Sequence, residues 1–255
     1  TWPSGAVIRA VAEGVGLSRM WFNAAAEQGI ELRCGTSAQR LVQDRRGRIT
    51  GLLVRDEEGD HEISARAVVL ACGGFEANAE WRARYLGRPW DTAKVRGTRY
   101  NNGDGLRMAL EIGALPHGQW SGMHGTPIDA EAPPFGDRKL TDKTNRLSYP
   151  FGVTLNTVGK RFIDEGEGFA LYTYAKTGGA ILSQPGSVAF QIFDAEVNDL
   201  LEPRYRTGTP IVADTLEELA DKLPVDSHRL LRTLREFNAA APTGGRFNPT
   251  VLDGL

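Results

Sequence analysis

The sequence lacks several features that would assign a protein to a class at once. Its 255 residues include only two cysteines, Cys34 and Cys72, too few for a disulfide framework or a cysteine-rich metal site. No apolar run has the length of a membrane span, and the first residues do not form a secretory signal. Lys and Arg (30) do not outnumber Asp and Glu (32), so nucleic acid is not attracted. We expect a cytoplasmic protein with reduced thiols and no metal centre.

Common nucleotide and metal motifs are also absent. The chain contains no G-x-G-x-x-G at the start of a βαβ unit, no Walker A loop and no H-E-x-x-H. It begins with Thr1 rather than Met and stops on "NPTVLDGL". We therefore expect a piece of a longer protein.

The pattern of apolar residues in the first part predicts a helix, a meander and a buried strand. Helical spacing covers 16–29, with Ser18 as a cap and Gly29 as the stop, and a second helix covers 103–113. Strands are expected at 30–35, 38–44, 49–56, 61–67 and, fully buried, 68–74. This order is typical of a small antiparallel layer attached to an α/β core.

The second part begins where the pattern changes, near Leu115. Residues 116–150 contain prolines, glycines and aromatics without periodicity, which predicts long ordered loops. Two strands are expected within 152–165 and one at 187–194, and helices at 195–205, 215–223 and 227–240. We therefore predict two domains, 1–115 and 116–255.

Glycines surround two candidate cofactor sites. Gly73 and Gly74 end the apolar run "RAVVLACGG", where backbone can approach a ligand closely or simply turn into a helix. Asp104 lies between two glycines at a helix start, where its carboxylate can cap the helix or accept hydrogen bonds from a ligand hydroxyl.

Three cationic or titratable side chains lie in or near loops. His124, in "WSGMHGTP", can donate to an anionic substrate or be merely structural. Arg161, in "GKRFIDE", has Asp164 and Glu165 nearby, which suits either a surface ion pair or a guanidinium aimed at a substrate carboxylate. Arg146 is a second candidate for such a contact, or an exposed loop arginine.

Five motifs in order, "ACGGFEAN", "NNGDGLRMALEIGA", "WSGMHGTP", "GVTLNTVGKRFIDE" and "SVAFQIFD", give the chain a family resemblance. It resembles the flavoprotein family of fumarate reductases, succinate dehydrogenase flavoprotein subunits and 3-ketosteroid dehydrogenases. The motifs "SYPFGV", "QPGSVAFQIFD" and "FNPTVLDG" are similar to its tricarballylate dehydrogenase branch. The resemblance spans nearly the whole chain.

The resemblance implies FAD as cofactor and assigns residues to it. Ala71, Gly73 and Gly74 match the strand that runs beneath FAD, and Asp104 matches the aspartate that helps to hold it. Ala38 falls where the family's backbone meets the adenine. Cys72 replaces the usual threonine.

The resemblance also implies a substrate site beneath a capping domain. His124 and Thr126 match the family's H-P-T motif, which reads H-G-T here, and Arg161 matches the arginine that serves fumarate reductases as proton donor or acceptor. The implied reaction removes a hydride and a proton from neighbouring carbons beside a carboxylate of a small di- or tricarboxylate. The electron acceptor stays open, with a membrane-associated redox partner as one candidate.

The family's amino-terminal dinucleotide motif and carboxyl-terminal substrate-binding segments have no match in the chain. The two domains would then be a partial FAD-binding domain and a capping domain, and we expect the chain alone to bind FAD weakly and to be inactive. A ketosteroid-type dehydrogenase, with Tyr149, Tyr172 and Tyr174 as candidate acids, and a non-catalytic capping or interaction module are the alternatives.

Overall fold

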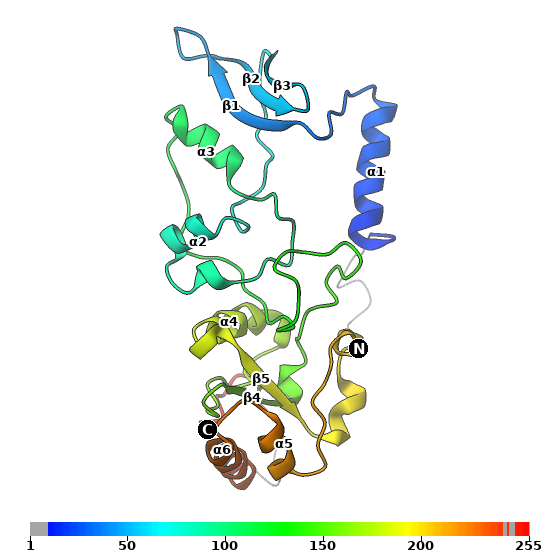
Figure 1. Ribbon diagram of the computed structural model, residues 1–255, viewed down its shortest axis with the longest axis vertical. Coiled ribbons are helices and arrows are strands. Elements are labelled where there is room, and N and C mark those ends of the chain that lie inside the picture. Colours follow the sequence, from blue (N-terminus) through cyan, green and yellow to red (C-terminus); the bar gives the residue numbers. More distant parts are fainter. Residues whose placement is uncertain (1–9, 242–243, 245–247, 255) are drawn as a thin grey trace. The chain divides into compact units, whose positions relative to one another are not determined.

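The computed structural model describes residues 10–241, 244 and 248–254, and the chain divides into two compact units. One runs to Leu70 and includes Glu111–Gly113; the other comprises Ala71–Leu110 and the chain from Ala114 onward. Helices and strands occur in both units, which confirms the predicted mixed α and β fold class (Figure 1). The domain boundary expected after Leu115 stays a prediction.

The first unit contains the predicted meander. Three antiparallel strands lie in the order β1-β2-β3, with bounds Ser37–Gln43, Ile49–Asp56 and Gly59–Ser64. Alternating apolar residues bury Leu41 and Val54, and tight turns after Asp44 and Asp56 connect the strands. The prediction of a strand at 30–35 is wrong, because this segment pairs with no strand of the described chain.

Helix α1 (Glu13–Glu27) confirms the first predicted helix and its stop at Gly29, which has a φ of 68°. Ser18 lies inside the helix and does not cap it, so that detail is wrong. The apolar side chains that suggested the helix are not covered: Met20 and Trp21 are 55% and 65% exposed.

The second unit carries the remaining elements. Its α-helices are α2 (Ala79–Leu86), α3 (Asp104–Glu111, whose last residue belongs to the first unit), α4 (Ala170–Leu182), α5 (Leu216–Lys222) and α6 (Ser227–Ala240). Strands β4 (Gly152–Asn156) and β5 (Ala189–Phe193) pair antiparallel. Short 3-10 helices are η1 (Trp90–Thr92), η2 (Tyr149–Phe151), η3 (Pro185–Ser187), η4 (Ala195–Leu200) and η5 (Pro203–Thr207). Among the described helices, none is long and apolar enough to cross a membrane.

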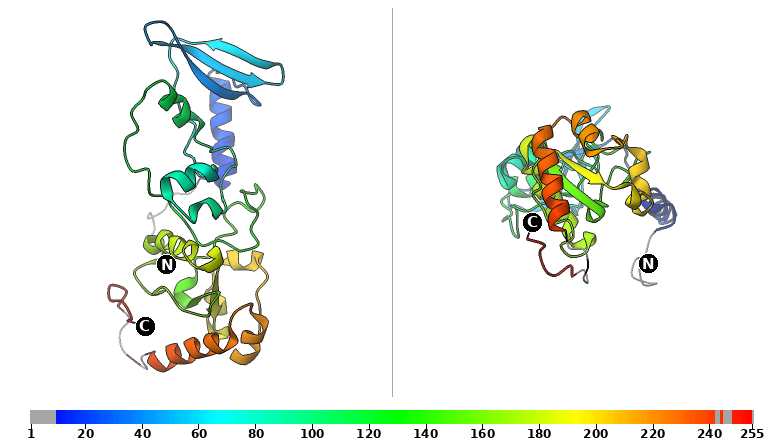
Figure 2. Two further views of the ribbon diagram at one scale, coloured as in Figure 1. Left: turned by 60° about the vertical axis from the view of Figure 1, so that its left-hand side comes forward. Right: turned by 90° about the horizontal axis from the view of Figure 1, so that it is seen from below.

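The β4–β5 ribbon organises the packing of this part of the chain. Figures 1 and 2 show α4 on one side of the ribbon and α5 and α6 on the other. The buried core contains Val153, Leu155, Ala220, Leu223, Leu230 and Leu234. Helix α5 begins as its sequence predicts, because the Thr215 hydroxyl accepts a hydrogen bond from the Glu218 amide at 3.1 Å. Amphipathic helices on one face of the ribbon thus supply the apolar core.

The buried strand expected at 68–74 does not form. The segment has no regular structure and Val69 is 89% exposed. A strand buried on both faces needs partner strands beside it and a layer that covers each face. Segment 68–74 belongs to neither of the two described sheets, so it has no partner strand.

Two further differences have local causes. The helix expected at 195–205 is two 3-10 helices, since Pro203 lacks the amide hydrogen that a continuous helix requires. The second strand within 152–165 shrinks to one bridge between Leu155 and Arg161. The loops predicted over 116–150 are confirmed up to η2, with a single bridge between Ile128 and Asn145.

The packing predicts which leucine matters for stability. Leu230 is 0% exposed in the core, whereas Leu200 is 58% exposed on η4. Leu230→Ala is expected to lower the free energy of unfolding by about 2–5 kcal/mol. Leu200→Ala is the matched control and should change it by less than about 0.5 kcal/mol. Urea denaturation followed by tryptophan fluorescence measures both, and equal effects would contradict the position of the core.

Candidate functional site

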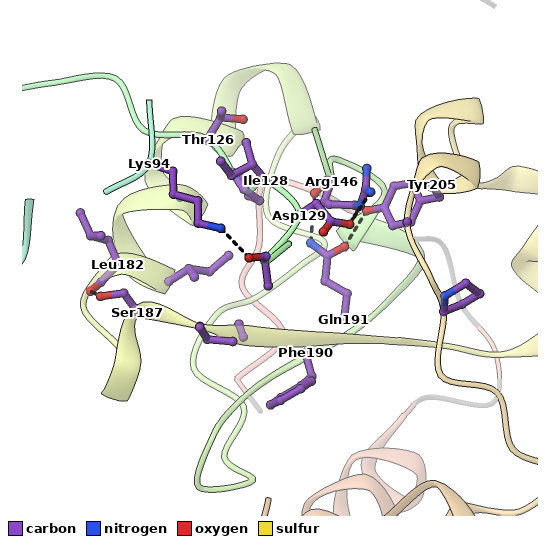
Figure 3. Close-up of a pocket in the computed structure, with 18 of the residues that line it drawn as sticks. Lys94, Thr126, Ile128, Asp129, Arg146, Leu182, Ser187, Phe190, Gln191 and Tyr205 are labelled. Carbon is purple, nitrogen blue, oxygen red and sulfur yellow. Dashed lines mark hydrogen bonds and ion pairs between the residues drawn. The ribbon is translucent and has the colours of Figure 1, made fainter. Parts of the chain in front are cut away.

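A cavity of about 1390 Å³ lies within the second unit, between α4, β5 and the loops before and after them. This is larger than the roughly 300–1,000 Å³ that small ligands usually occupy. Figure 3 shows Lys94, Leu182 and Ser187 toward one end of it and Arg146, Gln191 and Tyr205 toward the other. Apolar walls with polar groups at separate places suit an elongated ligand with more than one polar end.

His124 and Thr126 both line this cavity. The His124 ring meets the edge of the Tyr174 ring, with centroids 4.8 Å apart and planes at 77°. The Thr126 hydroxyl oxygen is buried and has no hydrogen-bond partner among the described residues. An unpaired buried hydroxyl costs about 1–3 kcal/mol, and the role of Thr126 as a substrate contact stays a prediction.

Arg146 also lines the cavity, but its donors are engaged by the protein. Its Nε and Nη2 lie 3.1 and 2.5 Å from Asp129 Oδ2, and its Nη1 donates to the Arg204 carbonyl at 3.1 Å. The guanidinium also lies over the Tyr205 ring, 5.3 Å from the centroid. Arg146 is therefore a nearly buried structural cross-link of the cavity wall, not an exposed loop arginine.

Tyr205 extends this cluster. Its hydroxyl donates to Gln191 Oε1 at 2.6 Å and accepts from the Ser148 amide at 2.9 Å. Burial raises the pKa of the Tyr205 phenol well above its ordinary value, although the hydrogen bond from Ser148 opposes that shift. The phenol therefore stays protonated and keeps donating to Gln191.

The opposite wall of the cavity is held by two cations that donate to backbone carbonyls. Lys94 Nζ donates to Ala130 and Ala132 at 2.5 and 2.6 Å (Figure 3). Arg82 is 4% exposed as a residue, and its guanidinium donates to the carbonyls of Glu76, Trp90, Asp91 and Ala93. Burial lowers the pKa of Arg82, but an arginine begins so high that it stays charged.

Arg161 is not among the residues that line the cavity. Its Nη2 lies 2.6 Å from Glu165 Oε2 and 2.6 Å from Asp253 Oδ2. The guanidinium lies 5.0 Å from the centroid of the Phe237 ring. Burial alone would lower the pKa of Arg161, but hydrogen bonds and attraction from Asp253 and Glu165 raise it above its ordinary value. The neighbouring carboxylates therefore hold the proton on this arginine instead of easing its loss.

Glu165 links Arg161 to the sheet. Its Oε1 accepts the Thr154 amide of β4 at 2.5 Å, and its side chain is 4% exposed. Burial raises the pKa of the Glu165 carboxyl, while the hydrogen bonds from Arg161 and Thr154 act in the opposite direction. A buried carboxylate of this kind requires both partners.

The predicted cofactor residues of the second unit come together from two motifs. The Gly103 amide donates to the Gly74 carbonyl at 3.0 Å, so the Cys72-Gly73-Gly74 corner lies against the loop that precedes Asp104. Gly73 has a φ of 75°, and a Cβ there would meet the Asn101 side chain at 2.9 Å. Packing within the chain therefore already requires this glycine.

Two features of this junction suit FAD. The Asp104 side chain is 50% exposed and only loosely paired with Arg107, at 3.8 Å, so its oxygens can accept hydrogen bonds from ribose hydroxyls. Gly73, in the corner that lies against this loop, is exposed, whereas Gly103 and Gly105 on either side of Asp104 are buried. Ala71 precedes the corner and is exposed, while Ala38 belongs to β1 of the first unit, beside an irregularity in the strand register. The two units are not placed relative to each other, so these adenine and phosphate contacts stay predictions.

Comparison with known proteins decides the family. The family model described as FAD binding domain matches residues 1–241. The chain belongs to this family. FAD is the cofactor that this membership implies, as the motifs predicted.

Relatives with established names cover nearly all of the chain. It is 31% identical to 4-oxocyclohexanecarboxylate 2-dehydrogenase of Sinomonas cyclohexanicum, over 92% of this chain and 42% of that protein. It is 30% identical to 3-oxosteroid 1-dehydrogenase of Mycobacterium tuberculosis strain H37Rv, over 85% of this chain and 41% of that one. The open conformation of a flavocytochrome c3 fumarate reductase matches with a TM-score of 0.67 and 29% identity, over 93% of this chain and 40% of that chain. The chain thus spans about two-fifths of the relatives' length.

Several residues of the cavity were not foreseen from the sequence. Asp129, Gln191 and Tyr205 hold Arg146, and Lys94 holds the loop after Asp129. Only Gln191 carried a signal, as a polar residue within an apolar strand pattern. No group of three metal-ligating side chains occurs within the described ranges.

The Arg161 cluster predicts a contrast between two Glu–Arg pairs. Glu165→Ala removes one of the carboxylates that pair with the buried Arg161 guanidinium, together with the acceptor of the Thr154 amide, and should lower the free energy of unfolding by about 3–5 kcal/mol. Glu217 pairs with Arg235 at 2.6 Å on the surface, with side chains 60% and 63% exposed. Glu217→Ala should change little. Chemical denaturation of both variants tests this, and a small effect at Glu165 would refute the buried pair.

Proposed function

We propose that the whole protein is an FAD-dependent dehydrogenase that acts on a CH–CH bond beside a carboxylate of a small di- or tricarboxylate. The observation that carries this proposal is that His124 and Thr126, the two residues that match the family's H-P-T motif, both line one cavity. A hydroxyl and an imidazole two residues apart can both donate to one carboxylate. Tricarballylate is the substrate that the motifs favour.

The residues of this chain would bind and orient the substrate. Thr126 Oγ1 donates to a carboxylate oxygen, and an imidazole nitrogen of His124 donates to the same group or holds the proton that leaves the substrate. Arg161 is the other proposed catalytic residue. It does not line the cavity and keeps its charge between Glu165 and Asp253, so its proposed role is that of a fixed positive charge near the substrate-binding wall and not that of a base.

The cofactor would be held by Gly73, Gly74 and Asp104, with Ala71 and Ala38 beside it. FAD, when bound, supplies the hydride-accepting chemistry that side chains lack. The protein contributes charge, orientation and exclusion of water. Arg146 enters the proposal as a residue that shapes the substrate-binding wall, because its donors already contact Asp129 and backbone carbonyls.

A cyclic ketone, including a 3-ketosteroid, is the second candidate substrate. Tyr174 lies against His124, and the cavity has apolar walls that include Ile128, Leu182 and Phe190. A tyrosine hydroxyl suits a ketone oxygen, and an apolar wall suits a ring. Two relatives named above are dehydrogenases of ring ketones. The ketone of the first relative, 4-oxocyclohexanecarboxylate, also bears a carboxylate.

The remaining parts of the proposal concern the surroundings of the enzyme. The electrons leave to an acceptor that is a separate redox protein or a membrane-associated partner, and the protein works in the cytoplasm. A non-catalytic capping or interaction module is the competing reading, and it predicts no flavin in the whole protein.

The test uses the whole protein, purified with its flavin and kept anaerobic. Tricarballylate is expected to bleach the flavin band, and a 3-ketosteroid is not. Bleaching by the steroid alone would move the assignment to the second candidate, and absence of flavin would overturn the enzyme reading. Arg161→Lys keeps a positive charge beside Glu165 and should abolish bleaching while flavin content is retained, whereas Arg161→Ala also leaves the buried Glu165 carboxylate without its cation and is expected to destabilise the fold.

Thr126 gives a graded prediction for the same protein. Thr126→Ala removes the hydroxyl and should weaken binding of the carboxylate about 10- to 150-fold, as expected for the loss of one hydrogen bond to a charged group. Thr126→Ser keeps the hydroxyl and serves as the control. Titration of the flavin spectrum with the acid measures both dissociation constants, and equal loss in the two variants would contradict a hydroxyl contact.

A further inference from the structure

Helix α4 contains two consecutive glycines, Gly178 and Gly179, in its interior. A glycine in a helix interior costs about 1 kcal/mol relative to alanine, so two in a row call for a reason. The two positions differ in their surroundings. A Cβ at Gly179 would meet nothing within 4 Å, whereas a Cβ at Gly178 would lie 2.6 Å from the Thr126 amide nitrogen.

The clash at Gly178 involves backbone and cannot be relieved by rotating a side chain. The same Cβ would lie 2.7 Å from the Gly125 carbonyl carbon and 2.8 Å from the Thr126 Cα. The main chain of the His124–Thr126 segment therefore rests directly on α4 at Gly178. Any side chain there would push this segment away from the helix.

Tyr174 lies one turn before Gly178 on the same helix and contacts the other end of the segment. Residues four apart share a helix face, so Tyr174 and Gly178 form one platform. The Tyr174 ring meets the His124 ring at 4.8 Å, while Gly178 meets the backbone of Thr126. One face of α4 thus sets both the orientation of the imidazole and the position of the hydroxyl.

Gly125, in the middle of the segment, also packs closely. A Cβ at Gly125 would lie 3.4 Å from Trp90 Cη2 and 3.5 Å from the Gly179 amide nitrogen, so the Trp90 ring and α4 both lie near this glycine. The Trp90 carbonyl in turn accepts a hydrogen bond from Arg82 at 2.8 Å. The segment therefore packs against α4 and against a residue that Arg82 holds.

We propose that Tyr174 and Gly178 are positioning residues, which place His124 and Thr126 for substrate binding. This inference rests on the proposed function, because only the proposed function makes His124 and Thr126 substrate-binding residues. Gly178 lets the Thr126 backbone approach α4 because it has no side chain, and Tyr174 orients the His124 ring through an edge contact. Neither needs to touch the substrate.

The experiment compares Gly178→Ala with Gly179→Ala in the whole flavin-containing protein. Both changes raise helix propensity equally, so only the contact with Thr126 separates them. Gly178→Ala should lower kcat/KM for the acid about 10- to 100-fold with the flavin retained, since displacement of a binding group by about 1 Å has effects of this size. Gly179→Ala should behave as the unmodified protein. Equal behaviour of the two variants would overturn the proposal.

Tyr174 provides a second pair of variants, which keeps the proposal testable if Gly178→Ala does not fold. Tyr174→Phe keeps the ring and should retain substrate affinity, whereas Tyr174→Leu removes it and should raise KM more than it lowers kcat. Loss of activity in Tyr174→Phe would show that the hydroxyl acts chemically and would overturn a positioning role for this residue.

A readout without turnover separates this inference from the proposed function. The His124 ring proton signals in the NMR spectrum should shift in Tyr174→Leu and Gly178→Ala and stay in place in Gly179→Ala. These shifts are expected even if no carboxylate bleaches the flavin, in which case the substrate assignment fails and the platform stands. Unchanged His124 signals in both variants would overturn the platform.

Discussion

The cavity depends on one kind of interaction, the donation of hydrogen bonds from cationic side chains to backbone carbonyls of irregular chain. Loops without strands or helices leave their carbonyl groups unpaired, and burial makes each unpaired group costly. Arg82, Lys94 and Arg146 each donate to two or more carbonyls around the cavity. Long loops can thus form a defined wall because a few cations satisfy many acceptors at once.

Elements with local signals were predictable from the sequence. The meander and the helices α1, α3, α5 and α6 follow from apolar periodicity, capping residues and glycine stops. Helix α4 carries a glycine pair that local propensity disfavours in a helix, and the contact with Thr126 explains one of the two, Gly178. For segment 68–74 the sequence predicted a strand that the structure lacks. Its strand propensity is strong, but no described strand pairs with it.

The site was predictable where its residues are close in the sequence and hidden where they are not. His124 and Thr126 share one loop, so their common position in the cavity follows from their spacing. The partners of Arg161 include Asp253, 92 residues later, and nothing in either local motif indicates that contact. Arg146 looked like an exposed loop residue because Asp129 and Tyr205 come near it only through tertiary structure.

The way in which Arg82 is buried has an electrostatic consequence for the cavity. Carbonyl dipoles solvate a charge but do not cancel it, and the hydrogen bonds of Arg82 within the described chain go to carbonyls rather than carboxylates. Arg146, by contrast, is neutralised by Asp129. Asp91 also attracts the Arg82 charge, and the lining of the cavity includes five acidic side chains and five Lys or Arg side chains. An anion entering the cavity would therefore be recognised by individual hydrogen-bond donors and not by a general positive field.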